Sequence, residues 1–134
     1  MVRRCGSGVC RTGTPTDSPS VISVHPAPQN PVMLRGSIHL HSTYGIDYVH
    51  LPELAPTAEI LDPYKKAKQG DWELYERQFL GLMRARRVET AAPRGLFDSA
   101  CLLCSEETPH HCHRRLVSEY LRDAWGDVEI EHLP

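Results

Sequence analysis

The sequence lacks several features that would point to a membrane or a nucleic-acid partner. None of its apolar runs approaches the length of a membrane-spanning helix, and the first residues, MVRRCGSGVC, lack the apolar centre of a signal peptide. Positive charge is not in excess, because the formal net charge is -2, and this argues against a generally basic nucleic-acid binder. We therefore expect a soluble cytoplasmic protein, and 134 residues suit one domain with a hydrophobic core.

The repeated C-x2-C pairs of a strong zinc signature are also missing. The sequence has five cysteines, Cys5, Cys10, Cys101, Cys104 and Cys112, of which only Cys101 and Cys104 form a C-x2-C. In a reducing compartment such cysteines are thiols or metal ligands more often than disulfides. We interpret Cys5 and Cys10 as ordinary exposed thiols and Cys101 as a small core residue.

Residues 1–43 lack any sustained period of 2 or 3.6 and are dense in Pro, Ser, Thr and Gly. Such a composition buries too little apolar surface to offset the entropy of ordering the chain. We predict a mostly irregular segment, with one short strand over Val21 to Val24. The domain proper is expected over residues 44–134.

Residues 44–134 show regular periodicities that predict alternating strands and helices. Thr57 and Asp71 fit helix N-caps, and Gly126 fits a helix stop. In chain order we expect a strand over 46–51, a short helix after 57, a helix over 72–87 and a loop from 88 to about 100. A strand buried on both faces over 100–104, a helix ending near 125 and a strand over 127–133 would follow. This order predicts an α/β fold, a single small domain with a short, largely parallel sheet flanked by helices.

The stretch CSEETPHHCHRR, residues 104–115, gathers two cysteines, three histidines, two acids and two arginines. Thr108 fits an N-cap and Pro109 a first helical position, so His110, His111 and Cys112 would form the first turn. In open α/β sheets, ligands bind beyond the carboxyl ends of the strands, where Cys104 would lie. The stretch therefore predicts a site at a strand-to-helix turn.

One chemical interpretation of this site is an activated thiol. A cysteine near a helix N-terminus, an arginine and histidines favours the thiolate, which is the nucleophilic form. Cys104 or Cys112 could serve, with His113 as the base and Arg114 binding an anionic substrate. We prefer Cys104, because it lies at the entry of the loop and faces the turn.

A second interpretation is a metal site. The spacing C-x7-C-H is not that of a strong zinc signature, so we do not favour a metal. The residues that could serve as ligands are Cys104, Glu106, Cys112 and His113, with His110 or His111 as substitutes.

A third interpretation is an anion pocket without covalent chemistry, built from backbone N–H groups, Arg114 and Arg115. A purely structural interpretation stands beside all three, because perturbed clusters also arise from structural ion pairs. Cys112 would then belong to the buried stripe of its helix, and Glu106 would cap the helix or pair with Arg114.

The stretch LLCSEETPHHCHRRLVSEYL resembles the family known as domain of unknown function 488, whose hallmark is Cys-x-Glu followed by Cys-His-Arg. IDYVHLPELAPT and GDWELYERQFLGLM also resemble this family, so the resemblance covers roughly residues 44–134. It implies a compact cytosolic α/β domain without an established activity. The residues that it singles out are Cys104, Glu106, Cys112, His113 and Arg114.

Residues 1–43 depart from this family, whose members open with a strand, a helix and a second strand. The sequence therefore predicts an atypical or incomplete start.

Our hypothesis is a cytosolic α/β protein whose Cys/Glu...Cys-His-Arg site binds a small anionic ligand and acts as a thiol-dependent enzyme. The expected catalytic residues are Cys104, Glu106, Cys112 and His113, and the expected ligand-binding residues are Arg114 and Arg115. The alternatives are an accessory module that binds a metal through Cys104, Cys112 and His113 or associates with nucleic acid, and an incomplete remnant without function. The sequence indicates no particular cofactor or oligomeric state.

Overall fold

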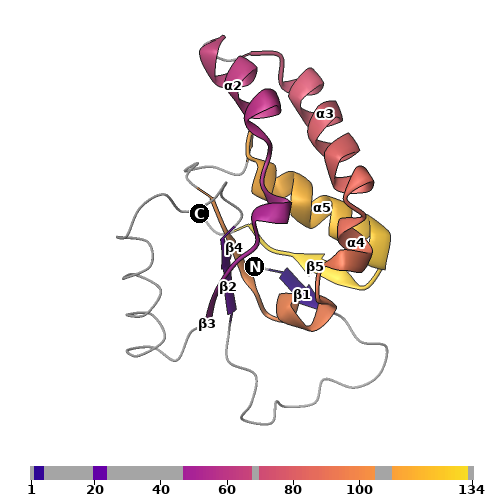
Figure 1. The fold of residues 1–134 in the computed structure, drawn as a ribbon. Helices are drawn as coiled ribbons and strands as arrows, with labels where there is room; N and C mark the ends of the chain where they lie inside the picture. The colour runs from indigo at the N-terminus through magenta and orange to yellow at the C-terminus, as the bar shows by residue number, and fades with distance from the viewer. Residues whose placement is uncertain (1, 5–19, 24–46, 68–69, 105–109, 133–134) are drawn as a thin grey trace.

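The computed structural model of the protein describes residues 2–4, 20–23, 47–67, 70–104 and 110–132. Within them, helices and a few short strands form a small domain (Figure 1). This mixture of helices and strands was predicted from the periodicities. None of the described helices has the length and apolar character needed to cross a membrane.

The short strand expected in the N-terminal segment is present as β2, Ser20–Ser23. It lies between β3, Asp47–His50, and β4, Cys101–Leu103, and pairs in parallel with both. Ile22 is opposite Val49 on one side and Leu102 on the other, and its side chain is fully buried. The prediction of strands near 21–24 and 46–51 is therefore confirmed. The rest of residues 5–43, including Cys5 and Cys10, lies outside the described ranges.

The last predicted strand is also present, as β5, Val128–Ile130, but it does not join the three parallel strands. It pairs antiparallel with β1, Val2–Arg4, which the sequence did not reveal. A three-residue strand carries too little pattern to predict its partner, because pairing depends on which edge the chain can reach.

Two of the helices begin where local sequence signals place them. A 3-10 turn, η1, covers Pro52–Leu54, and α2, Ala58–Lys66, follows Thr57 as predicted, with Pro63 inside it. The helix α3, Trp72–Ala85, begins after Asp71, whose carboxylate accepts a hydrogen bond of 3.1 Å from the backbone N–H of Leu74. The last long helix, α5, covers His113–Trp125 and ends at Gly126, which has the left-handed backbone (φ 76°) of a helix stop.

The prediction of a loop over 88–100 is wrong. This segment contains α4, Val88–Ala91, and the 3-10 turn η2, Arg94–Phe97. Val88 and Phe97 are buried, so packing against the core holds short helical turns that the sequence pattern is too brief to predict.

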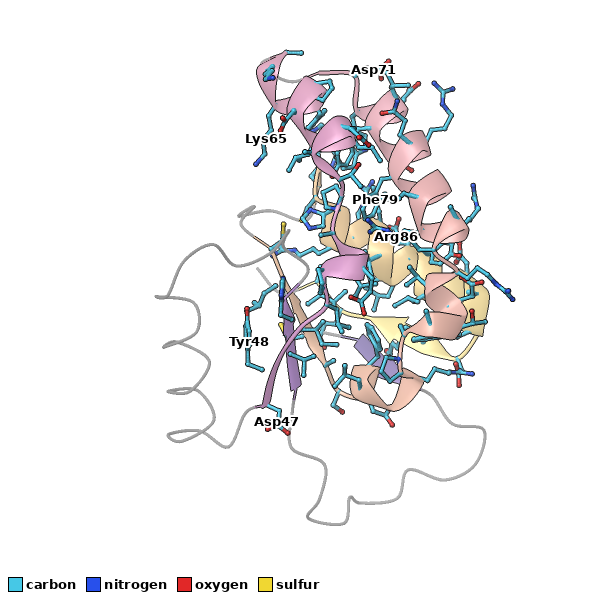
Figure 2. All side chains as sticks on the ribbon, in the orientation of Figure 1. Asp47, Tyr48, Lys65, Asp71, Phe79 and Arg86 are labelled. Atoms are coloured by element: carbon cyan, nitrogen blue, oxygen red, sulfur yellow. The ribbon has the colours of Figure 1, made fainter. Side chains whose placement is uncertain are left out.

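The core lies between α3, α5 and the three parallel strands, and α3 packs against both α2 and α5 (Figure 1). Arg86 at the end of α3 donates to the carbonyl oxygens of Glu53 and Ala55 at 2.6 and 2.8 Å (Figure 2). It therefore connects the end of α3 to the segment after β3. The largest fully buried side chains are Phe79, Phe97, Ile22, Leu54, Met83, Leu116, Leu121, Val88, Val117 and Cys112.

Candidate functional site

The candidate site lies where β4 ends and α5 begins. Cys104 follows the last residue of β4, and Cys112 and His113 stand at the start of α5. The connection between them, residues 105–109, is outside the described ranges, and so are Glu106 and the predicted helix cap at Thr108 and Pro109. Leu102 is buried but Leu103 is 39% exposed, so the prediction that this strand is buried on both faces is wrong. The strand lies at an edge of the sheet.

The helix begins later than its cap signals predicted. His110, His111 and Cys112 are not in α5, whose first residue is His113. Cys112 has an extended backbone (φ -128°, ψ 133°), and its side chain is 1% exposed. This buried thiol forms a hydrogen bond with Cys104, which lies eight residues earlier in the sequence.

Three predicted site residues come together. The Cys104 Sγ lies 3.4 Å from His113 Nδ1 and 3.8 Å from Nε2. Together with the Cys112 sulfur, these ligand-type atoms all lie within 4.8 Å of one another. The His113 ring is buried, and its centroid lies 5.9 Å from the Phe79 ring in an edge-to-face arrangement. The core therefore holds the imidazole beside the Cys104 thiol.

The environment of Cys112 makes its thiol a weaker acid than an ordinary cysteine. A hydrogen bond with Cys104 raises the pKa of the Cys112 thiol far above its ordinary value of 9.0, and burial raises it further. The backbone N–H and the charge of Arg114 act in the opposite direction but do not cancel this rise. The Cys112 thiol therefore keeps its proton to a higher pH than an ordinary cysteine, because its pKa is raised.

The other predicted residues lie around this cluster. Arg115 is 3.7 Å from a Glu76 carboxylate oxygen and 3.8 Å from one of Glu119, and its guanidinium lies 5.8 Å from the centre of the Trp72 ring. His111 also stacks on Trp72, with 4.8 Å between the ring centroids. Arg115 and His111 are therefore in contact with α3, whereas Arg114 is half-buried close to Cys112.

A cavity of about 290 Å³ opens beside the cluster. His111 and His113 form one side of it, and the other described lining residues come from α2 and α3: Leu61, Tyr64, Lys65, Trp72 and Tyr75. The sequence interpretation did not include these residues in the site, because it considered only the stretch 104–115. A half-buried tryptophan close to two histidines is the feature that reveals them.

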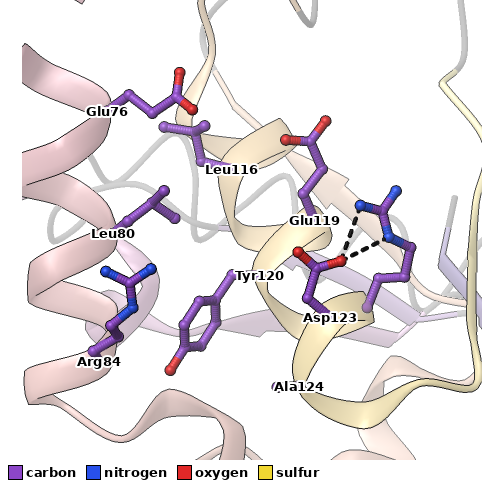
Figure 3. A pocket seen from close by; sticks show the side chains of 9 residues that line it. Glu76, Leu80, Arg84, Leu116, Glu119, Tyr120, Asp123 and Ala124 are labelled. Carbon is purple, nitrogen blue, oxygen red and sulfur yellow. Dashed lines mark hydrogen bonds and ion pairs between the residues drawn. The ribbon is translucent and has the colours of Figure 1, made fainter. Parts of the chain in front are cut away.

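A larger cavity of about 380 Å³ lies between α3 and α5 (Figure 3). Its described lining contains no cysteine or histidine, and it combines acids such as Glu119 with bases such as Arg84. Arg122 and Asp123 neutralise each other there at 3.0 Å. Its size alone does not make it the site, because His113 of the Cys104, Cys112 and His113 cluster lines the other cavity.

Residues 21–121 match the family described as "Domain of unknown function DUF488". The chain belongs to the DUF488 family. The match covers most of the chain and begins earlier than the predicted resemblance, at the strand β2. The DUF488 match includes Cys104, Cys112 and His113, but its description assigns no activity to them. No curated protein and no solved structure shows a significant match to this DUF488 chain.

Proposed function

We propose that this DUF488 protein is a thiol-dependent enzyme that acts on a small anionic ligand, with Cys104 as nucleophile and His113 as general base. The observation that carries this proposal is the 3.4 Å between Cys104 Sγ and His113 Nδ1. At this separation the imidazole can accept the thiol proton, and the thiolate is the reactive form. His113 is held by the core, so the pair is positioned before any ligand binds.

Cys112 supports this assignment as a hydrogen-bond donor. Because its pKa is raised, it remains a neutral thiol when Cys104 is ionised, and its hydrogen bond stabilises the Cys104 thiolate. Arg114 contributes positive charge near the same sulfurs, since its charge opposes the rise in the pKa of Cys112. In the proposed enzyme Cys112 and Arg114 position and stabilise the nucleophile, and the ligand-binding roles of Arg114 and Arg115 stay predictions.

We expect Cys104 to be alkylated by iodoacetamide at pH 7 at least about ten times faster than Cys101. An ordinary thiol is only a few per cent ionised at this pH. If His113 takes the proton of Cys104, a larger ionised fraction can raise its alkylation rate by this factor. Peptide mapping by mass spectrometry after timed labelling gives the rate for each cysteine. Cys101 is the matched control, because it is half-buried and lies at the start of the same strand.

The variant His113→Gln should remove most of this advantage while its circular dichroism spectrum stays that of the parent. Equal labelling rates for Cys104 and Cys101 in the parent protein would reject the thiol-enzyme proposal. An unchanged Cys104 rate in His113→Gln would reject the role of His113 as base.

A second candidate function is metal binding, which the triad Cys104, Cys112 and His113 favours directly. Two sulfurs and an imidazole nitrogen are a donor set that Zn²⁺ prefers, and they are three of the four ligands of a tetrahedral site, counted over the described residues. Tetrahedral zinc would require donor separations of roughly 3.5–3.8 Å. The 3.4 Å between Cys104 and His113 fits this, and the other separations, up to 4.8 Å, would have to shorten.

Elemental analysis of protein purified without an affinity tag tests this second candidate. A metal protein should contain close to one zinc or iron per chain, and Cys112→Ser should lose it. A chelator should then accelerate Cys104 alkylation in the parent protein. Metal far below one per chain, with a labelling rate unaffected by chelator, would exclude the metal function and favour the thiol enzyme.

A further inference from the structure

The cavity beside the cluster has the composition of a ligand site as well as the right position. It lies where α2, α3 and the start of α5 meet, and His113 is part of its lining. The same residue lies 3.4 Å from Cys104 Sγ. A molecule in this cavity would therefore touch the imidazole that neighbours the proposed nucleophile.

Aromatic rings form most of one wall of this cavity. The Trp72 ring stacks on Tyr75 with 5.2 Å between centroids, and it meets the Tyr64 ring edge-on at 5.7 Å. Trp72 is half-buried, so part of its ring remains accessible. Such a wall favours a flat aromatic ring over a bulky aliphatic group, because aromatic pairs gain from stacked and edge-to-face contacts.

The polar groups of the cavity select the charge of the ligand. None of the described residues that line it is acidic, whereas Lys65, His111 and His113 all contribute nitrogen donors. Lys65 is exposed on α2 (Figure 2) and has no ion-pair partner among the described residues. A lysine and two imidazoles without a carboxylate suit an anionic group such as a phosphate.

We infer that this cavity is the ligand site of the Cys104–His113 pair and takes a planar aromatic ring carrying an anionic group. The ring would lie against Trp72, and the anionic group would contact Lys65 and His111. This inference rests on the proposed function for any reaction of the bound molecule with Cys104. The binding itself depends only on the residues of the cavity.

Calorimetric titration of the full-length protein with three probes tests the inference. The probes are 1-naphthyl phosphate, which has both the ring and the charge, 1-naphthol, which lacks the charge, and cyclohexyl phosphate, which lacks the aromatic ring. We expect saturable binding of 1-naphthyl phosphate and at least about tenfold weaker binding of the other two. Failure of 1-naphthyl phosphate to bind, or equal binding of cyclohexyl phosphate, would overturn the inference.

Two neighbouring lysines provide a matched pair of variants. Lys65→Gln should weaken the binding of 1-naphthyl phosphate about fivefold or more, whereas Lys66→Gln, an exposed residue of α2 outside the described lining, should leave it unchanged. Equal weakening in both variants would mean nonspecific attraction and would overturn the site. Neither variant changes the aromatic wall, whose substitution could disrupt the packing of α2 against α3.

Alkylation of Cys104 separates this inference from the proposed function. Bound 1-naphthyl phosphate should slow Cys104 alkylation at pH 7, because the ligand covers His113. A reactive Cys104 in a protein that binds no probe would reject the cavity and keep the thiol enzyme. Tight binding with an unreactive Cys104 would keep the cavity and reject the thiol enzyme.

Discussion

Replacing Phe79 with alanine is expected to lower the free energy of unfolding by about 3–5 kcal/mol, which is a large part of the stability of a small domain. Phe79 is fully buried on α3 (Figure 2), and its ring lies 6.1 Å from Tyr75 and 5.9 Å from His113. Its loss removes apolar contacts and leaves a cavity between the helices. Urea denaturation followed by circular dichroism measures the change.

The matched control is Leu74→Ala in the same helix. Leu74 is 40% exposed, so its truncation should change the free energy of unfolding by less than about 1 kcal/mol. A similarly small loss for Phe79→Ala would mean that α3 is not packed as described. In the folded fraction of Phe79→Ala, Cys104 should also label more slowly, because the core no longer holds His113 in place.

Raising the pH from 8 to 10 is expected to reduce the free energy of unfolding by about 1.4 kcal/mol through Cys112 alone. The folded protein raises the pKa of this thiol above its ordinary value of 9.0, chiefly through the hydrogen bond with Cys104. Below pH 9 the folded and unfolded chains both keep the proton, and this contribution is fully present. Above pH 9 the unfolded chain releases the proton while the folded chain does not, so unfolding becomes more favourable.

Urea denaturation at pH 8, 9 and 10, in reducing buffer containing a chelator, measures this loss. Cys112→Ser should show a flatter dependence on pH, because the serine hydroxyl does not ionise in this range, and Cys101→Ser should behave like the parent. Identical pH dependence in the parent and in Cys112→Ser would contradict the raised pKa. Burial and the Glu89 carboxylate raise the pKa of Tyr120 from 10.0 to about 12. Above pH 10 the unfolded chain therefore ionises Tyr120 before the folded chain does, and this second loss of stability is the reason that the range stops at pH 10.

The Tyr120 hydroxyl donates to the Glu89 carboxylate at 2.5 Å, and the Trp125 indole donates to the Glu89 carbonyl at 2.9 Å. These bonds join α4 to α5, two segments far apart in sequence. The sequence interpretation placed Tyr120 in a helix and Glu89 in a loop. Only the folded chain brings the two side chains together, so no local pattern could have predicted this link.

Most helix boundaries could be predicted because their causes are local. Asp71 caps α3 with its own carboxylate three residues from the bonded N–H, and Gly126 ends α5 because it adopts the left-handed backbone with no steric penalty. The start of α5 could not be predicted in this way. There, α5 begins at His113, after a buried and extended Cys112 whose thiol contacts Cys104, eight residues earlier in the sequence.

The candidate site, like the helix boundaries, was predicted only in part from the sequence. Sequence by itself determined the family and the position of Cys104 after a strand. It also determined the short set of cysteines, histidines and arginines from which a site could be built. All of these depend on residue identity and local periodicity. Tertiary structure alone decided that Cys104, Cys112 and His113 converge, that Arg115 and His111 contact Trp72, and that an aromatic cavity free of acidic residues in its described lining opens beside them. Those contacts join α2, α3, β4 and the start of α5, and their distances depend on how the helices pack rather than on the spacing of residues along the chain.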